Sequence, residues 1–329
     1  MMHEGIIKIV LRHCVAVFVF ALCTACAIAA DPFPNKPIRI VVNTAPGGLT
    51  DIMTRSVGQK MGERLGQSVI IENKAGADGL LGIRYVKNQP ADGYTLLGTA
   101  GTVAIQPAVK LDPGYDLVKD FTGVGPMVSA PVMLVEGMSQ PDKTLADFIA
   151  RAKATPDQLS YGSAGVGTTT HLGAALFLQK AGIKVMHVPY KGNGAAMADV
   201  MAGRVTMIFE AYGSGVGKVK GGQLKALAVS STKRLPGLPD VPTFAEQGLP
   251  DYSFNLWLGL LAPAGMPKEV LAKLSDALHF ALNSKEIKDR MLEGGSEPMI
   301  MSPAEFNDFI KRDTVQIQKV INDLGIPKL

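Results

Sequence analysis

One stretch, residues 38–51, constrains the fold of this chain more than any other. Residues 38–42 are mostly β-branched and apolar, which predicts a buried strand, and Pro46-Gly47-Gly48 then predicts a tight turn. Thr50 or Asp51 fits the N-cap of a helix that follows. The start of such a helix presents backbone N–H groups that attract anions. We therefore expect an anion-binding turn at residues 44–48, which we call the first glycine loop.

Strands and helices alternate along most of the chain. Further apolar runs predict strands at 68–71, 94–99, 132–135, 160–163, 185–188, 205–209, 224–229 and 257–261. Helical patterns follow at 80–86, at 145–152, at 195–201 and from 269 onward; the helix after the first glycine loop would bury Ile52, Met53, Val57, Met61 and Leu65. This alternation is typical of parallel α/β sheets, in which ligands bind at the carboxyl ends of the strands. Thr99 and Gly101 occupy such an end.

A second segment repeats the design of the first glycine loop more than a hundred residues later. A short predicted strand runs into glycine and hydroxyl residues at 163–168, the second glycine loop, and a helix follows. Two such loops in 329 residues predict one loop in each of two domains. The candidate ligand-binding residues here are Ser163, Gly165, Gly167, Thr168, Thr169 and His171.

The first thirty residues have the pattern of a secretory signal. Lys8 and Arg12 precede a short apolar run, and small residues up to Ala29 and Ala30 fit a cleavage site. The run is shorter than the ~20 apolar residues that a membrane span needs. We expect cleavage near Ala29 or Ala30 and a periplasmic mature protein, with lipid attachment at Cys26 as the alternative.

Composition and motif spacing argue against several classes of function. A net charge of +4 is too balanced for a nucleic-acid-binding surface. The glycine loops lack the full spacing of dinucleotide and phosphate-binding motifs, and neither Ser163 nor Ser214 has the glycine that a nucleophile elbow requires. His171, His187 and His279 show no metal-ligand spacing. We therefore expect no enzyme, no cofactor and no metal.

Three polar residues each have two interpretations. Asp51 either stabilises its own helix with Arg55 four residues on, or accepts a hydrogen bond from a ligand. His171 either braces the second glycine loop or contacts the ligand. Glu210 ends a predicted strand at the expected ligand edge, where an acid is as consistent with ligand contact as with a structural role.

Several motifs spread over the mature chain carry a resemblance to a known family. They are Pro37-Ile38-Arg39-Ile40-Val41-Val42, Pro46-Gly47-Gly48 with Thr50-Asp51, Ala91-Asp92-Gly93-Tyr94-Thr95-Leu96, Gly165-x-Gly167-Thr168 with His171-Leu172, Val188-Pro189-Tyr190-Lys191-Gly192, Leu238-Pro239-Asp240-Val241-Pro242-Thr243 and Trp257-x-Gly259-Leu260-Leu261-Ala262-Pro263. With them the chain resembles the substrate-binding receptors of tripartite tricarboxylate transporters, also called Bug receptors. It departs from many relatives at Asn43 and Thr44, where they carry proline and an aromatic residue, and at Glu210, where they carry aspartate.

The resemblance implies an α/β periplasmic binding protein of the two-lobe, type II-like Venus flytrap kind, with a mostly parallel sheet flanked by helices in each lobe. We expect lobe 1 to comprise residues 31–130 and 256–329, and lobe 2 residues 131–255. In the family, the two glycine loops hold a ligand carboxylate through N–H groups, hydroxyls and ordered waters. The implied ligand-binding residues outside the second loop are Thr44, Gly47, Gly48, Thr50, Asp51, Thr99, Gly101 and Glu210.

The expected partners are a small organic acid and the membrane subunits of a tripartite tricarboxylate transporter, with the receptor acting as a monomer. A ligand-sensing module for a sensor kinase is the alternative, since the same fold serves either role. The low aromatic content, 6%, argues against a sugar ligand, because sugar receptors stack rings on their ligands. A C4–C6 dicarboxylate or a hydroxy acid is the expected ligand class.

Overall fold

The structure, a computed structural model, describes residues 33–252 and 254–328. The predicted signal segment and its cleavage site lie outside these residues. From Lys36 onward the described chain forms one compact unit. Within the described residues, no helix is both long and apolar enough to cross a membrane.

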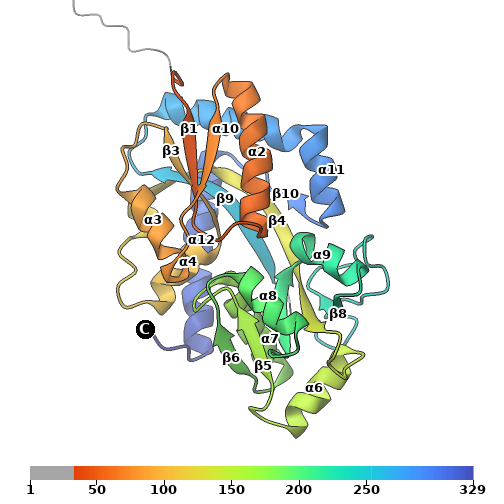
Figure 1. Ribbon diagram of the computed structural model, residues 1–329. Coiled ribbons are helices and arrows are strands. Elements are labelled where there is room, and N and C mark those ends of the chain that lie inside the picture. The colour runs from red at the N-terminus through yellow and green to blue at the C-terminus, as the bar shows by residue number, and fades with distance from the viewer. Residues whose placement is uncertain (1–32, 253, 329) are drawn as a thin grey trace, which may run out of the picture. The chain divides into compact units, whose positions relative to one another are not determined.

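The elements alternate much as the sequence predicts (Figure 1). The strands are β1 Ile38–Val42, β2 Val69–Asn73, β3 Thr95–Ala100, β4 Phe121–Gly137, β5 Ser160–Ser163, β6 Met186–Pro189, β7 Met207–Ala211, β8 Leu224–Val229, β9 Asn255–Pro263 and β10 Glu297–Pro298. The helices are α2 Leu49–Leu65, η1 Ala77–Gly79, α3 Leu80–Lys87, α4 Thr102–Val109, α5 Leu117–Asp120, α6 Leu145–Ala154, α7 Thr169–Ala181, α8 Asn193–Met201, α9 Tyr212–Lys220, α10 Lys268–Asn283, α11 Lys285–Glu293 and α12 Pro303–Asp323.

The main path of the sheet has the strand order β2-β1-β3-β9-β4-β7-β5-β6. At one end β1 pairs in parallel with β2 and β3, and at the other end β5 pairs in parallel with β6 and β7. In the middle, β9 is antiparallel to β3 and β4, and β4 is antiparallel to β7 and β8. Parallel pairing thus holds at both ends, as expected, while antiparallel strands join the two ends.

Strand β4 changes partners along its length (Figure 1). Residues 121–131 pair with β9, and residues 132–137 pair with β7 and β8. We call β1, β2, β3 and β9 the first strand set and β5, β6, β7 and β8 the second strand set. The change of partner falls beside the predicted lobe boundary at 130/131, and β9 begins at Asn255, beside the other one. The lobe limits themselves stay a prediction.

Each strand set has an apolar core of its own. Val41 of β1, Leu97 of β3 and Phe306 of α12 are buried in one cluster beside the first strand set. Phe177 of α7 and Phe209 of β7, with ring centroids 5.7 Å apart, belong to a second cluster beside the second strand set. Burial of such aromatic and aliphatic side chains is the dominant stabilising contribution in a fold of this size. These cores fix the carboxyl ends of β1, β3, β5 and β7, where both glycine loops lie.

The first helix differs in detail from its prediction. Its N-cap is Gly48, so the predicted caps Thr50 and Asp51 lie inside the first turn. Of the predicted apolar face, Met53, Val57 and Met61 are buried and Leu65 is half-buried, but Ile52 is 38% exposed. The prediction for Ile52 is wrong because Met53, Val57 and Met61, each four residues apart, form the buried face, and Ile52 lies about 100° around the helix from Met53.

Two helices near the glycine loops are not predicted by the sequence pattern. Helix α4 contains Pro107, a residue that usually ends a helix, and it follows β3 after a single residue. Helix α9 is rich in glycine, which disfavours helix by about 1 kcal/mol per residue relative to alanine. Both helices lie beside residues of the predicted site, as described next.

Candidate functional site

The first glycine loop connects the carboxyl end of β1 to the start of α2. Gly48 is the N-cap, and no described side chain caps the helix there. Gly47 has a φ of 86°, a conformation that favours glycine. A Cβ built on Gly47 or Gly48 would meet no described atom within 4 Å. The backbone N–H groups of the first helical turn are therefore open to a ligand.

Asp51 stabilises the first glycine loop by accepting a hydrogen bond from its backbone. Its carboxylate is 4% exposed and accepts hydrogen bonds from the Gly47 N–H (3.0 Å) and from Asn73 Nδ2 (2.9 Å), and Arg55 Nη2 lies 2.9 Å from it. Burial acts to raise the pKa of Asp51, but the hydrogen bonds from Arg55, Gly47 and Asn73 outweigh burial and lower it. Both carboxylate oxygens thus have protein partners, which favours the structural interpretation of this residue.

Unpaired polar atoms gather at the end of β1. The side-chain amide of Asn43, 1% exposed, and the hydroxyl of Thr44 have no hydrogen-bond partner among the described residues. An unpaired buried polar group costs about 1–3 kcal/mol, so such atoms call for a specific explanation. They lie directly before the open helix start, which makes them candidates for contact with a ligand or an ordered water.

The second glycine loop differs because its own side chains occupy its N–H groups. Ser163 Oγ accepts from the Gly165 N–H (3.1 Å), Thr170 Oγ1 accepts from the Ala164 N–H (3.1 Å), and His171 Nδ1 accepts from the Gly167 N–H (3.2 Å). Thr168 is the N-cap of α7, and its hydroxyl accepts from the His171 N–H. The loop is therefore closed by internal hydrogen bonds.

A stack of rings supports the second glycine loop. The rings of His171, His187 and Tyr161 lie against one another, with centroid distances of 4.2 Å from His187 to His171, 4.7 Å from His187 to Tyr161 and 6.4 Å from Tyr161 to His171, and His187 Nε2 lies 2.7 Å from Ser163 Oγ. Burial lowers the pKa of His171 to about 4; burial and the neighbouring His171 lower that of His187 to about 3. Both rings are neutral at neutral pH. Because His171 Nδ1 accepts a hydrogen bond, its proton is on Nε2.

Helix α4 lies against the second glycine loop. The Thr169 N–H donates to Thr102 Oγ1 (3.4 Å), and the amide nitrogen of Gln106 donates to the carbonyls of Val166 and Gly167, each at 3.1 Å. Gly101 packs against this contact: a Cβ built on it would lie 3.3 Å from Thr169 Cγ2. The structure thus brings Gly101 to the second loop.

Thr99 lies in β3, two residues before Gly101, where it is fully buried, and its hydroxyl donates to the neighbouring carbonyl of Ala100 (3.2 Å). Thr50 is likewise buried, within the first turn of α2. Neither predicted site residue has a side chain that is exposed in this structure, and their contact with a ligand stays a prediction.

Glu210 ends β7 at the same edge of the sheet as the second glycine loop. Its carboxylate is 6% exposed and accepts hydrogen bonds from Asn193 Nδ2 (2.6 Å) and from the Ser214 hydroxyl. Burial raises the pKa of Glu210, against the lowering effect of these hydrogen bonds. Glu210 therefore links the starts of α8 and α9 through hydrogen bonds, which is a structural role. Its contact with a ligand stays a prediction.

The starts of α8 and α9 also lie close to the first glycine loop. A Cβ built on Gly192, the N-cap of α8, would be 3.6 Å from Ala45 Cβ, and one built on Gly213 of α9 would be 3.4 Å from Leu49 Cδ1. No described side chain caps either helix. Three helix starts without a described side-chain cap, those of α2, α8 and α9, therefore lie near one another.

Sequence reasoning missed Gln106, Asn73 and Asn193, each of which holds a residue of the predicted site. The signal for Gln106 was present, because it is a lone polar residue in the otherwise apolar run 103–109. Asn73 and Asn193 lie next to expected turns, where asparagine is common for local reasons. Their partners, Asp51 and Glu210, are distant in sequence, so only the fold reveals these pairs.

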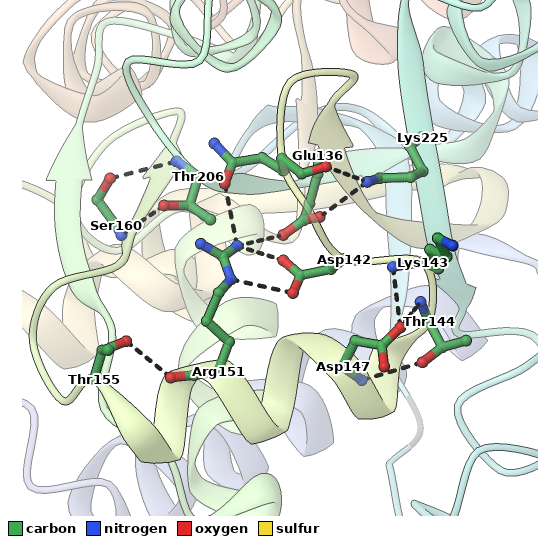
Figure 2. A network of polar contacts seen from close by, with 11 residues as sticks. Glu136, Asp142, Lys143, Thr144, Asp147, Arg151, Thr155, Ser160, Thr206 and Lys225 are labelled. Atoms are coloured by element: carbon green, nitrogen blue, oxygen red, sulfur yellow. Dashed lines mark hydrogen bonds and ion pairs between the residues drawn. The ribbon is translucent and has the colours of Figure 1, made fainter.

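Figure 2 shows a second polar cluster, which includes Arg151, Asp142, Glu136 and Lys225. Arg151 of α6 contacts Asp142, Gln140 Oε1 (3.1 Å) and Glu136 Oε1 (3.4 Å), and Lys225 of β8 donates to the Gln140 carbonyl (2.8 Å). Burial and the nearby Asp142 raise the pKa of Glu136 to about 8, against Lys225 and Arg151. These residues bond to one another and tie α6 to the ends of β4 and β8. We interpret the cluster as structural.

Within the described residues, no group of three or more histidine, cysteine or acidic side chains is arranged to hold a metal ion. The chemistry of the region is hydrogen-bond donation from helix starts and hydroxyls, which suits an anion.

Comparison with known proteins identifies the family. A family model described as tripartite tricarboxylate transporter family receptor matches residues 53–326. The chain belongs to this receptor family. The match includes the second glycine loop and all of α2 after its first turn.

Solved structures of similar proteins agree with this assignment. The receptor is similar to the periplasmic binding protein BugD, at 30% identity and a TM-score of 0.86 over 90% of this chain and 100% of that one. It is similar to Rpa4515 of R. palustris with adipate, at 32% identity and a TM-score of 0.86 over 90% and 100%. It is also similar to MatC from Rhodopseudomonas palustris with bound malate, at 29% identity and a TM-score of 0.83 over 88% and 100%. The receptor therefore has the two-lobe fold of periplasmic binding proteins.

Proposed function

We propose that this receptor captures a small aliphatic dicarboxylate or hydroxy acid in the periplasm and delivers it to the membrane subunits of a tripartite tricarboxylate transporter. The observation that carries the proposal is the open, uncapped start of α2 beside the unpaired side chains of Asn43 and Thr44. Two similar structures, at 32% and 29% identity, contain adipate and malate, acids of this class.

We assign one ligand carboxylate to the first turn of α2. Burying an unpaired carboxylate is prohibitive, so several N–H and hydroxyl donors must converge on it. Gly47 and Gly48 leave that turn uncovered, and Asp51 holds its shape by accepting from the Gly47 N–H. A micromolar affinity requires about 8 kcal/mol of net binding free energy, which a few such hydrogen bonds and apolar contact supply.

The uncapped starts of α8 and α9 support a second acidic group on the ligand. They lie beside Ala45 of the first glycine loop and Leu49 of α2, and the positive ends of their dipoles favour negative charge. Glu210 lies at the same place, but burial raises its pKa and Asn193 and Ser214 donate to its oxygens. Its negative charge is thus absent or compensated, and it does not oppose a second carboxylate.

Ligand capture would close two lobes. We place lobe 1 at residues 31–130 and 256–329 and lobe 2 at residues 131–255, a division supported by the change of partner along β4. The first glycine loop then belongs to lobe 1 and the second to lobe 2. A ligand that contacts the start of α2 in lobe 1 and the starts of α8 and α9 in lobe 2 favours the closed state by its extra contacts there. Export through residues 1–30, with cleavage near Ala29 or Ala30, would place the monomer in the periplasm.

The test is a ligand screen on the protein that starts at residue 31. Thermal unfolding is measured with adipate, malate and other dicarboxylates and hydroxy acids, and with adipamide and glucose as uncharged controls. A ligand at 100 times its dissociation constant stabilises the folded state by about 2.7 kcal/mol and raises Tm by several degrees. We expect such shifts with acids alone, confirmed by calorimetry. Shifts only with sugars or with amines that lack a carboxylate would contradict the proposal.

Delivery requires a separate measurement. Uptake of the identified radiolabelled acid is compared in cells with and without the gene for this receptor. We expect uptake to fall when the gene is deleted and to return with the intact gene. Unchanged uptake, together with an altered transcriptional response to the acid, would favour a sensing role.

A further inference from the structure

Gln106 of α4 makes an unusual set of hydrogen bonds. The side chain is fully buried, and its Nε2 lies 3.1 Å from the Val166 carbonyl, 3.1 Å from the Gly167 carbonyl and 3.2 Å from the Asp78 carbonyl. Three carbonyl acceptors around one atom fix the orientation of the amide, because an oxygen there would be repelled by all three. Gln106 thus bonds α4 to η1 and to the second glycine loop.

The other end of this side chain has no partner. Gln106 Oε1 is buried and accepts no hydrogen bond from the described residues. Leaving a buried acceptor unpaired costs about 1–3 kcal/mol, so the glutamine carries a cost that its bonds through Nε2 must offset. A leucine of similar size would remove that cost but would leave the carbonyls of Asp78, Val166 and Gly167 without this donor. The contribution of the glutamine is therefore the bridge that its Nε2 makes between these carbonyls.

The glycines of the second loop permit the close approach on which these bonds depend. A Cβ built on Gly167 would lie 2.3 Å from Val109 Cγ2 and 3.2 Å from Gln106 Nε2, and one built on Gly165 would lie 2.3 Å from Asp78 Oδ1. Lys110 pairs with Asp78 at 2.9 Å and holds its carboxylate in place. Both glycines thus leave room for residues of η1 and α4, which belong to the other proposed lobe.

We propose that Gln106 is a positioning residue that latches the closed state. This proposal rests on the proposed function and on its lobe division. That division places Gln106 and Asp78 in lobe 1 and Val166 and Gly167 in lobe 2. Opening the lobes breaks the two bonds to the second loop and keeps the bond to Asp78. The latch increases the fraction of ligand-free molecules that are closed. Because the closed state is the one that binds, the affinity for the ligand rises in proportion to this fraction.

The test uses the ligand-free protein and the variant Gln106→Leu. The Thr169 N–H, which donates to Thr102 across the same contact, reports the latch through its hydrogen exchange rate. We expect exchange in the peptide containing Thr169 to accelerate about tenfold in the variant, the effect of removing about 1.4 kcal/mol of closing free energy. Small-angle scattering should show a larger radius of gyration for the ligand-free variant than for the wild type.

Gln247→Leu is the matched control. Gln247 is a half-buried bridging glutamine that donates to the Leu227 carbonyl (2.6 Å) and accepts from the Leu145 N–H (3.2 Å), but all three residues lie within the proposed lobe 2. This variant should lose stability without changing exchange at Thr169 or the radius of gyration. Gln106→Glu, which keeps the length but places a carboxylate against three carbonyls, should open the protein further than Gln106→Leu.

Unchanged exchange at Thr169 and an unchanged radius of gyration in both Gln106 variants would overturn the latch. These measurements need no ligand, so they stand apart from the screen for carboxylate binding. If the wild type binds no acid but Gln106→Leu still opens it, the proposed function fails and the latch remains. If acids bind and Gln106→Leu leaves their affinity and the exchange unchanged, the latch fails and the function remains.

Discussion

The two glycine loops follow the same order of strand, glycines and helix, yet their surroundings differ. Around the first loop, a Cβ on Gly47 or Gly48 would meet no described atom within 4 Å, and no described side chain caps α2. In the second loop, a Cβ on Gly165 or Gly167 would collide with Asp78 or Val109, and Thr168 caps α7. The first loop is open, whereas the second is filled.

The difference shows that glycine can be required for opposite reasons. In the first loop it keeps N–H groups uncovered, so that an anion can reach them. In the second loop it lets another part of the chain approach, while internal acceptors such as His171 already use the N–H groups. The open loop suits ligand binding, and the filled loop suits mechanical contact between the proposed lobes.

The largest expected effect is that of Gly167→Val. Gly167 has a φ of 71°, where a β-branched residue is strained, and the new Cβ would lie 2.3 Å from Val109 Cγ2. We expect the free energy of unfolding to fall by about 3 kcal/mol. Urea denaturation measures it, with Gly48→Val as the matched variant, because Gly48 has a φ of −82° and open space. Equal losses of unfolding free energy in the two variants would contradict the difference between an open first loop and a filled second loop.

Acid should loosen the filled loop. Burial lowers the pKa of His171 in the folded state from its ordinary value of 6.5 to about 4, so the unfolded chain binds more protons between these values. The free energy of unfolding should therefore fall as pH drops from 6.5 to 4, on the order of 3 kcal/mol from this residue. Denaturation midpoints measured at each pH test this, and His171→Phe should reduce the slope, while His187, whose pKa burial lowers to about 3, should keep the slope that remains. An unchanged slope in the variant would assign the effect to groups other than His171.

The affinity of the variant Gly48→Val for the ligand acid tests the role of the open first loop. The new side chain would cover the start of α2, so we expect binding of whichever acid the wild type binds to weaken about a hundredfold, close to 2.7 kcal/mol. The free energy of unfolding should change by less than about 0.5 kcal/mol. Calorimetry measures the affinity and denaturation the stability. Full affinity in a well-folded variant would place the ligand carboxylate elsewhere.

The smallest expected effect is that of Asp51→Asn. The amide keeps the shape but replaces one acceptor oxygen by a donor, so the bond from the Gly47 N–H or the contacts with Arg55 and Asn73 must be lost. We expect a loss of about 1 kcal/mol in unfolding free energy. The loss in affinity should stay below that of Gly48→Val. A larger loss in affinity than in stability would favour direct ligand contact by Asp51.

The sequence predicted the fold and the place of both loops, because periodic apolar runs and Pro-Gly turns are local signals. It also placed Gly101 at an edge that the structure brings to Thr169. The cap at Gly48 and the helix containing Gln106 escaped prediction. A glycine cap has no side chain to signal it, and Pro107 masks the helical pattern of α4. Contacts such as Gln106 with Gly167 depend on how distant segments pack, which no local pattern encodes.

Trp257 gives this molecule an optical property of its own. It is the single tryptophan of the sequence, is 7% exposed and donates from Nε1 to Asp313 (2.9 Å). Gly101, which packs on its indole, also contacts Thr169 of α7, so the ring lies behind the contact between α4 and the second glycine loop. If that contact separates, water reaches the indole, and its emission should shift to longer wavelength. Opening and closing could then be followed by intrinsic fluorescence in stopped flow, without a dye or an engineered label.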